Sequence, residues 1–499
     1  MKKVFKLSIL FTVALTSVFV ASCAKSENNE EPLPTEQIIF NGNTIGNGNQ
    51  EFEIKGKHVI SKGTYILKGW VYITAGAQLT IEPGTIIKGD KDTKAALIVE
   101  MGGKLIAQGT STEPIVFTSN QAKGSRKPGD WGGLIICGKA VNNKTTMIIE
   151  GGPRSSHGGT DNADNSGVIS YVRVEFAGYP FRPDQEINGI TLGSVGSGTK
   201  FDHVQVSYSN DDSYEWFGGA VNAKYLVAYH GWDDDFDSDN GFAGSVQYAL
   251  GVRNPKLADV SVSNGFESDN NAEGSTTAPM TSAVFSNVTL VGPIGQDGAF
   301  VNNSTYIDGG AMNPNNGSKL GQFHSAMQIR RSSRLSIFNS VAVGYPIGLI
   351  IENDKGSATQ TGATNENMKI KNVVFGGLTI LGSDKNKSFL DQYSVNSTDL
   401  DATKESFSST YFKRATGGNT NYSLLTDIKL AQPNSTIASP NFGPIAGSPL
   451  TGKTGLFTDA LVSGAFFDKV DFIGAFKSNS DADNWTKGWT NFDPQNANY

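Results

Sequence analysis

Three acidic segments between residues 208 and 271 carry the side chains best suited to chemistry in this sequence. They are residues 209–216, 230–241 and 264–271, and each follows a short apolar or alternating run that is typical of a β-strand. Two unit charges about 4 Å apart repel by roughly 4 kcal/mol at an effective dielectric constant near 20. If the segments meet in the fold, their carboxylates therefore need a hard cation, protonation or full solvation.

Carboxylate and amide oxygens are the ligands that Ca²⁺ prefers, and the ion takes six to eight of them at about 2.3–2.6 Å. The sequence therefore predicts a calcium site. The alternative is a solvated acidic ridge in which Asp and Asn only shape the turns. The candidate metal ligands are Asp211, Asp212, Asp233, Asp234, Asp235, Asp237, Asp239, Glu267, Asp269 and Asn270.

Aromatic and basic side chains lie in or after the same segments. Trp and Tyr rings beside carboxylates suit stacking against sugar rings, although buried apolar platforms are an alternative role for them. Paired carboxylates can also act as general acid and base, but their separation is not readable from the sequence, so no catalytic residue is assigned. The candidate substrate-binding residues are Tyr214, Trp216, His230, Trp232, Phe236 and Arg330.

The composition and a recurring strand pattern predict the elements that position these side chains. The chain has 58 glycines among 499 residues and few long charged residues, which favours many short strands and tight turns. Similar strand cores recur 32 residues apart, from Val172 to Val204 and from Val341 to Val373. We therefore expect an all-β, right-handed parallel β-helix over residues 40–450. A β-sandwich is the alternative, but its turns usually come every 8–12 residues or so.

Residues 451–499 differ from the strand repeats and are rich in aromatic side chains. A solenoid needs its open end covered, so we expect this region to form a C-terminal cap. An alternative role is a glycan-stacking pair formed by Trp485 and Trp489.

The N-terminus predicts export and a lipid anchor. A positive start is followed by an apolar run at Leu7–Val20 that is too short to span a bilayer comfortably. Small residues then precede Cys23, which indicates a signal peptide at residues 1–22 and lipidation of Cys23. Residues 23–39 form a polar, acidic tether. We therefore expect an outer-membrane lipoprotein that faces the cell surface; an ordinary secretory peptide ending near Ala21 is the alternative.

Charge and cysteine content exclude other classes. The net charge is −7, from 41 Lys and Arg against 48 Asp and Glu, and phosphate contacts need a basic surface, so we expect no nucleic-acid partner. Cys137 is the one cysteine left after Cys23, so it cannot form an internal disulfide. Its apolar surroundings predict a buried, inert thiol.

Several segments together resemble a family of exported bacterial lipoproteins with a right-handed parallel β-helix of the pectin-lyase-like kind. The resemblance covers nearly the whole mature chain and implies fold and location rather than an activity. The segments that carry it are Lys68–Val71, Ala75–Gly89, Gly129–Leu134, the blocks around Asp211 and Asp234, and Gly488–Thr490.

Enzymes on this fold offer two comparisons. Polygalacturonase-like hydrolases use clustered Asp, a Gly-His-Gly and an Arg-x-Lys; here Asp211-Asp212 and His230-Gly231 occur in that order, but Tyr229 precedes His230 and Arg-x-Lys is absent. Pectate-lyase-like enzymes hold Ca²⁺ with carboxylates and use Arg or Lys as the base, and no motif fixes such a base here. The arginines available for it are Arg253, Arg330, Arg331 and Arg334.

Because these catalytic motifs are incomplete, the sequence favours a surface module that binds glycan or another extracellular polymer. Its lipid anchor would hold it in the membrane. A Ca²⁺-dependent polysaccharide lyase or a glycoside hydrolase is the alternative.

Overall fold

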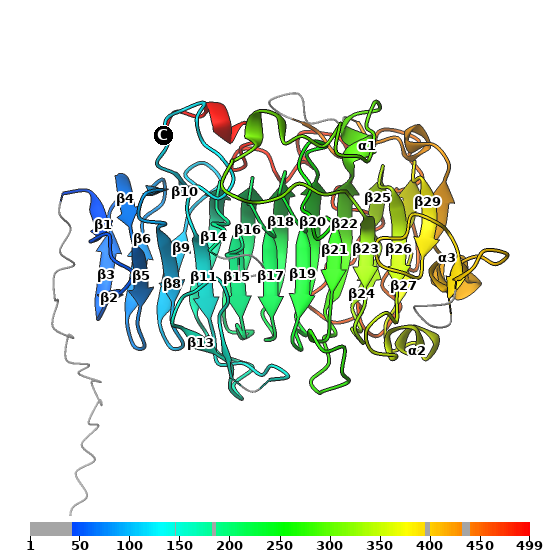
Figure 1. Cartoon of the computed structure of the whole chain (residues 1–499), viewed down its shortest axis with the longest axis horizontal. Helices are drawn as coiled ribbons and strands as arrows, with labels where there is room; N and C mark the ends of the chain where they lie inside the picture. Colours follow the sequence, from blue (N-terminus) through cyan, green and yellow to red (C-terminus); the bar gives the residue numbers. More distant parts are fainter. Residues whose placement is uncertain (1–41, 145, 182–185, 395–399, 432–439) are drawn as a thin grey trace, which may run out of the picture. The chain divides into compact units, whose positions relative to one another are not determined.

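Short apolar runs separated by turns form a right-handed parallel β-helix, as the sequence predicts (Figure 1). The structure, a computed structural model, describes residues 42–144, 146–181, 186–394, 400–431 and 440–499. The predicted signal peptide at residues 1–22, the lipidation site Cys23 and the tether at residues 23–39 lie outside these residues. No helix in the described ranges has the length and apolar character needed to cross a membrane.

The smaller of the two large sheets contributes one strand to each coil, and neighbouring strands run parallel. Within the described ranges it has 11 strands. They are β2 (Phe52–Ile54), β5 (Trp70–Ile73), β8 (Ala96–Val99), β11 (Gly133–Cys137), β15 (Ile190–Gly193), β17 (Tyr214–Phe217), β19 (Phe236–Asp239), β21 (Phe266–Ser268), β23 (Ser325–Ile329), β26 (Ile347–Ile351) and β29 (Ile380–Ser383).

The larger sheet has 17 strands in the described part of the chain and combines two parallel ladders. The first ladder contains β3 (Lys57–Ile60), β6 (Gln78–Ile81), β9 (Lys104–Gln108), β24 (Ser336–Phe338) and β27 (Ile370–Lys371). The second contains β1 (Thr44–Gly46), β4 (Thr64–Lys68), β7 (Ile86–Gly89), β10 (Ile115–Ser119), β25 (Val341–Val343), β28 (Val374–Gly376) and β32 (Thr420–Tyr422). Long, bent strands join the ladders: β14 (Gly167–Glu175), β16 (Lys200–Ser207), β18 (Ala223–Tyr229), β20 (Ser245–Val252) and β22 (Val284–Val291).

The bend in these long strands lies at one residue that adopts a positive φ in each coil. Tyr171, His203, Tyr225 and Tyr248 have φ between 49° and 63°, and their rings stack on one another with centroids 4.2, 4.4 and 5.0 Å apart. Asn287 continues this bend row in β22, and Asn is one of the few residue types that tolerates this conformation. The row fixes the register of the coils, since each ring packs against its equivalent in the next coil.

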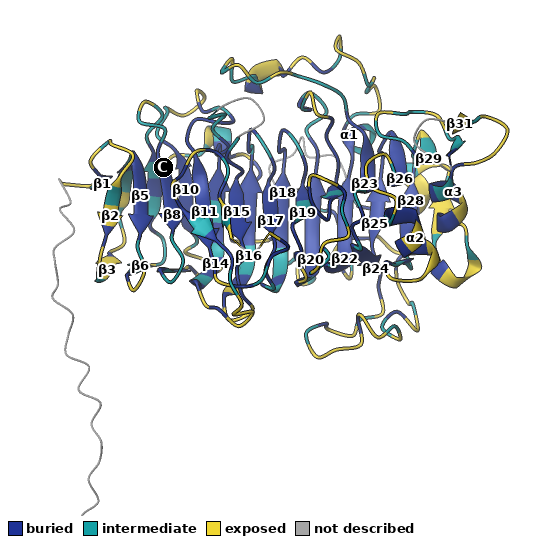
Figure 2. Cartoon of the chain, turned by 60° about the horizontal axis from the view of Figure 1, so that its bottom comes forward, coloured by how far each residue is buried: buried dark blue, intermediate teal, exposed yellow. Residues whose placement is uncertain are grey.

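The core follows from the two-residue repeat of a strand, because alternate side chains point to opposite faces. In the smaller sheet one alternate set is buried between the sheets, and the strands are dark blue in Figure 2 while exposed residues gather in the loops. The thiol of Cys137 is buried, as predicted, and burial raises its pKa. One inward column, in register from coil to coil, contains Leu134, Ile190, Tyr214, Phe236, Phe266 and Met327.

The C-terminal segment, residues 440–499, lies along the side of the β-helix rather than over its end. Asp459 binds Lys371 at 2.9 Å near the last coils, whereas the backbone carbonyl of Asn491 accepts a hydrogen bond from Gln205 at 2.9 Å, several coils earlier. The chain end thus returns toward the first strands (Figure 1). This differs from the expected end cap because the outer face of the second ladder is itself apolar and needs cover.

The far end of the solenoid is covered instead by α3 (Phe407–Phe412), which contacts β26 and β29. Phe412 stacks on Phe375 of the core with centroids 4.5 Å apart. The remaining short elements are α1 (Pro293–Gln296), α2 (Thr359–Thr364), η1 (Gly310–Met312), η2 (Ala415–Gly417), η3 (Leu425–Ile428), η4 (Pro494–Asn496) and the antiparallel pairs β12 (Met147–Ile148) with β13 (Ser156–His157) and β30 (Tyr393–Ser394) with β31 (Leu400–Asp401).

Candidate metal centre

A column of carboxylates lies on the outer face of the smaller sheet. Glu215 of β17, Asp237 of β19 and Glu267 of β21 occupy equivalent positions in three successive coils, with Thr191 before them and Gln328 after them. Neighbouring strands are about 4.8 Å apart, so the register places three acidic side chains directly above one another.

A second column lies in the turn that precedes each of these strands. The backbone N–H of Asp234 donates to the carboxylate of Asp212 at 2.8 Å, and the N–H of Asn264 donates to the carboxylate of Asp234. The side-chain oxygen of Asn264 in turn accepts from the hydroxyl of Ser325 at 2.8 Å. Each side chain in the column is therefore held by the next coil.

The two columns and the loop residues beside them form three groups in which one oxygen per residue lies within 4.8 Å of the others. Asp212 and Asp237 each belong to two groups, so the groups overlap across three coils. No salt bridge joins these carboxylates to a Lys or Arg of the described ranges, except at Glu267. We call the set the acidic strip; it consists of Asp211, Asp212, Glu215, Asp233, Asp234, Asp237 and Glu267.

Burial dominates the electrostatics of the acidic strip. It raises the pKa of Asp212, Glu215 and Asp237 well above the usual range of a carboxyl group, and neighbouring carboxylates raise these pKa values further. Burial raises the pKa of Asp234 to about 6, against the opposing effect of the Asn264 N–H. It also raises the pKa of Glu267 to about 8, although nearby Arg330 acts in the opposite direction. Protons or a bound cation would therefore stabilise the strip at neutral pH.

Two oxygens within the strip lack any partner. One carboxylate oxygen of Asp233 and one of Asp237 are shielded from solvent and accept no hydrogen bond. A buried oxygen without a donor costs roughly 1–3 kcal/mol, and more when it carries charge. Oxygen atoms that converge in this way fit a metal ion, and because Asp233 and Asp237 belong to different groups, each of the two oxygens would need an ion at its own group.

Four of the predicted metal ligands do not join these groups, because each has another partner. Asp239 bonds to the amide of Asn240, and Asp269 forms ion pairs with two arginines. Asn270 donates to backbone carbonyls of residues 275 and 277. The fourth residue, Asp235, is fully buried against an arginine.

That arginine, Arg253, has no exposed surface and contacts the Asp235 carboxylate at 2.8 Å. It also donates to the carbonyls of Gly231 and Trp232 at 3.2 and 3.3 Å and to that of Asn264 at 3.4 Å. Arg253 thus ties together the turns of two coils that carry acidic-strip residues. It therefore positions the turns that carry these candidate ligands.

The predicted sugar-stacking role of four aromatic residues is wrong, because their rings are buried. Tyr214, Trp216 and Phe236 point into the core of the β-helix, where Phe236 stacks on Tyr214 with centroids 5.6 Å apart. Trp232 is fully buried in a separate cluster with Phe176 and other apolar residues. The two-residue repeat explains this placement, since an outward Glu215 requires inward neighbours on both sides.

The two polar members of the predicted substrate site are also engaged. His230 is 7 % exposed and hydrogen-bonds to the hydroxyl of Tyr208 at 3.0 Å, and burial lowers its pKa to about 3. Arg330 forms ion pairs with Glu267 and with Asp269, the latter at 2.9 Å. His230 directly follows β18 and lies against Tyr208, whereas Arg330 lies at the end of the acidic strip.

Three contributors to the strip were not singled out from the sequence. Glu215 is part of one oxygen group, and Asn188 donates to its carboxylate. Glu150, from the long loop around β12 and β13, hydrogen-bonds to Glu215, and burial raises the pKa of Glu150 to about 7. For Glu215 a signal exists, because the aromatic–acid pairs Tyr214-Glu215, Phe236-Asp237 and Phe266-Glu267 repeat in register. No local pattern marks the other two.

We predict that metal-free protein loses stability as the pH rises from about 6.5 to 8.5. A carboxyl group whose pKa is raised in the folded state holds a proton that the unfolded chain has released, so each such proton costs about 1.4 kcal/mol per pH unit as the pH rises toward the folded pKa. Glu267, with its pKa of about 8, titrates within this window. Buried histidines such as His230, whose pKa is lowered, make the folded protein more stable as the pH rises, but only below about pH 6.5, the usual pKa of histidine.

Chemical denaturation in the presence of a chelator measures this dependence. The slope should become shallower in Asp237→Asn, which removes one of the coupled carboxyls, and should stay unchanged in the exposed-residue control Asp92→Asn. Stability that rises with pH across this window would contradict the assignment.

Comparison with known proteins agrees with this architecture. A family model described as a pectate-lyase like β-helix domain matches residues 53–423, which include the whole acidic strip. No curated protein and no solved structure matches the chain. The fold is compatible with carbohydrate binding and with enzymes that act on polysaccharides, and the clusters of acidic residues could bind a metal ion. By the extent of this match, the chain belongs to the pectate-lyase-like β-helix domain family.

Proposed function

We propose that this protein is a lipid-anchored surface protein that binds acidic polysaccharide through Ca²⁺ held on the acidic strip. The observation that carries the proposal is the overlap of three oxygen groups across three coils, with Asp212 and Asp237 shared between them. The unpartnered oxygens of Asp233 and Asp237 support it independently.

The donor set favours Ca²⁺ over smaller ions. The strip offers carboxylate oxygens spread over several backbone segments, and Ca²⁺ accepts six to eight oxygens in flexible geometry, whereas Mg²⁺ demands a near-ideal octahedron. Extracellular Ca²⁺ modules often bind at about 10⁻⁴–10⁻³ M, so even a modest site would be filled outside a cell. When bound, Ca²⁺ would supply a positive centre able to accept a further carboxylate oxygen from a uronic acid.

Cationic side chains at the end of the strip suit the same ligand. Arg331 contacts the Asp269 carboxylate at 2.6 Å through one nitrogen, and its side chain remains 29 % exposed. A guanidinium has five N–H donors in a planar fork, so one ion pair leaves donors for another carboxylate. An acidic polysaccharide lying along the strip would therefore meet Arg331 at its end.

A glycoside hydrolase is the second candidate, because the acidic strip holds carboxyl groups close together. A hydrolase needs one protonated and one ionised carboxyl group. Burial raises the pKa of Glu150 to about 7, so Glu150 can carry the proton at neutral pH, but burial also raises the pKa of Glu215 well above its usual range, so Glu215 does not supply the ionised partner. A lyase is less well supported, because Arg330 is held between two carboxylates that raise its pKa well above its usual value. Such a guanidinium cannot accept the proton that a lyase base removes.

We predict that the protein binds polygalacturonate or alginate in Ca²⁺ and releases it in a chelator. Affinity electrophoresis in gels containing the polymer measures the dissociation constant, and Asp237→Asn should raise it about tenfold or more because the shared ligand is lost. Asp92→Asn is the matched control. Equal binding with and without Ca²⁺ would contradict the proposal, and release of unsaturated products or new reducing ends would favour an enzyme instead.

A thermal-shift measurement separates the metal from the glycan. Free Ca²⁺ at about 100 times its dissociation constant would stabilise the fold by about 2.7 kcal/mol, so the melting temperature should rise in wild type and not in Asp237→Asn. If Ca²⁺ raises the melting temperature but the protein binds no polymer, the result would support the metal centre and refute the glycan ligand.

The proposed anchor has its own test. The apolar segment before Cys23 and the acidic tether after it support lipidation and surface display. Cys23→Ala should move the protein from the membrane fraction to the soluble fraction of the producing cells, since the acyl chains provide the attachment. A variant that stays with the membrane would refute the anchor.

A further inference from the structure

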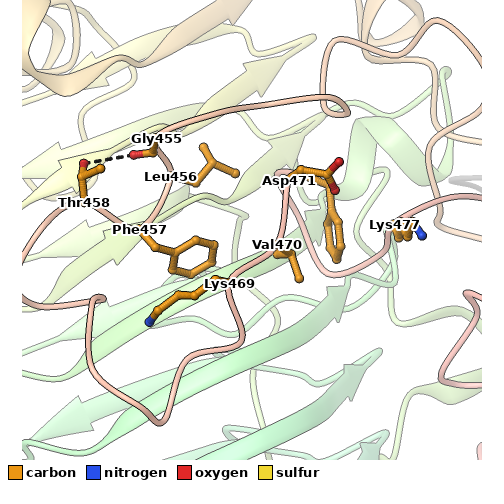
Figure 3. Close-up of a pocket in the computed structure, with 9 residues that line it drawn as sticks. Gly455, Leu456, Phe457, Thr458, Lys469, Val470, Asp471 and Lys477 are labelled. Atoms are coloured by element: carbon orange, nitrogen blue, oxygen red, sulfur yellow. Dashed lines mark hydrogen bonds between the residues drawn. The ribbon is translucent and has the colours of Figure 1, made fainter.

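The C-terminal segment contains a cleft that is separate from the acidic strip. Figure 3 shows its two walls, residues 455–458 and 469–472, with Lys477 at one side. The cleft has a volume of about 580 Å³, within the size range of small-ligand sites. Its position along the outer side of the β-helix leaves it accessible from solvent.

The walls are preformed, because backbone hydrogen bonds join them. The N–H of Lys453 donates to the carbonyl of Asp471 at 2.7 Å, and the N–H of Ile473 donates to the carbonyl of Leu450 at 2.8 Å. The carbonyl of Phe472 also accepts from the side chain of Asn287 in the bend row at 3.0 Å. The cleft is therefore anchored on the β-helix, and a ligand would not have to order it.

The interior is apolar, with one half-buried aromatic ring. Leu456 and Phe472 are 5 % and 7 % exposed and form buried parts of the lining. The ring of Phe457 stands at the cleft, beside Leu456 and Lys469 in Figure 3. The Lys469 ammonium lies 5.2 Å from the centre of this ring and donates to the carbonyls of residues 462 and 464, so two of its donors are already engaged.

Two polar groups at the rim have no hydrogen-bond or ion-pair partner among the described residues. They are the carboxylate of Asp471 and the ammonium of Lys477, both on exposed residues that line the cleft. An apolar wall with an acceptor and a donor of opposite charge suits a neutral molecule with an apolar face and several hydroxyl groups. A neutral ligand can hydrogen-bond to both groups without meeting a like charge at either of them.

We propose that this cleft binds a neutral pyranose ring of a polysaccharide, independently of Ca²⁺ and of the acidic strip. The C–H face of the sugar would cover Phe457 and remove apolar area from water. Its hydroxyl groups would then bond to Asp471 and Lys477. We assign sugar stacking to Phe457 rather than to the pair Trp485 and Trp489. Trp489 is 1 % exposed, and Trp485 stacks on Phe476 with centroids 5.3 Å apart.

The test uses affinity electrophoresis of the full chain in gels containing xyloglucan, mixed-linkage β-glucan, xylan or galactomannan, with chelator throughout. At least one of these neutral polymers should retard wild type. Phe457→Ala and Phe457→Leu should weaken binding at least tenfold, whereas Phe457→Tyr, which keeps the ring, should stay within about threefold. The matched control is Phe466→Ala, another half-buried ring of the same segment that does not line the cleft.

Melting temperatures show whether each variant is folded, and Phe457→Leu preserves apolar volume if the alanine variant is unstable. Retardation by none of the four polymers would overturn the proposal, as would unchanged binding in a folded Phe457→Leu protein. Binding that disappears in Asp237→Asn would assign the neutral polymer to the acidic strip and overturn a separate site. Binding that persists in that variant would support it.

Discussion

Stacking of successive coils forces equivalent side chains into contact, and this constraint accounts for most of what is unusual in the structure. Where the equivalent positions are apolar or aromatic, as in the Tyr214–Phe236 column, the contact builds a core. Where they are acidic, as at Glu215 and Asp237, the same register confines like charges about 4.8 Å apart. The core and the acidic strip are therefore two faces of the same strands. A change of register by one residue would exchange them.

Like charges held this close would destabilise the strip, and several contacts hold them in place. The buried pair of Asp235 and Arg253 fixes the turns from inside, and backbone N–H groups of Asp234 and Asn264 hold the next carboxylates from the neighbouring coil. Such partners orient ligands and restrict the ways in which the charges can move apart. Relief by rearrangement is thus limited, which leaves protons or a cation as compensation.

The fold was predictable from the sequence because its signal is repeated: strand cores 32 residues apart recur at Val172 and Val204, and these residues are register partners. The position of the acids was predictable for the same reason. For Trp216 and Phe236 the sequence leaves burial open as the alternative to sugar stacking, although their alternation with Glu215 and Asp237 indicates strands with one inward and one outward face. The Glu150 contact and the course of the C-terminal segment depend on long-range packing, for which no local pattern exists.

A cation shared among coils would compensate the acidic strip, and anomalous scattering from crystals grown with Ca²⁺ tests for it most directly. The structure predicts a peak among the carboxylates of Asp212, Glu215, Asp237 and their neighbours, with six to eight oxygens at about 2.3–2.6 Å. The peak should vanish in Asp237→Asn. A map without a peak at the strip in millimolar Ca²⁺, with these carboxyl groups hydrogen-bonded to one another, would contradict the account.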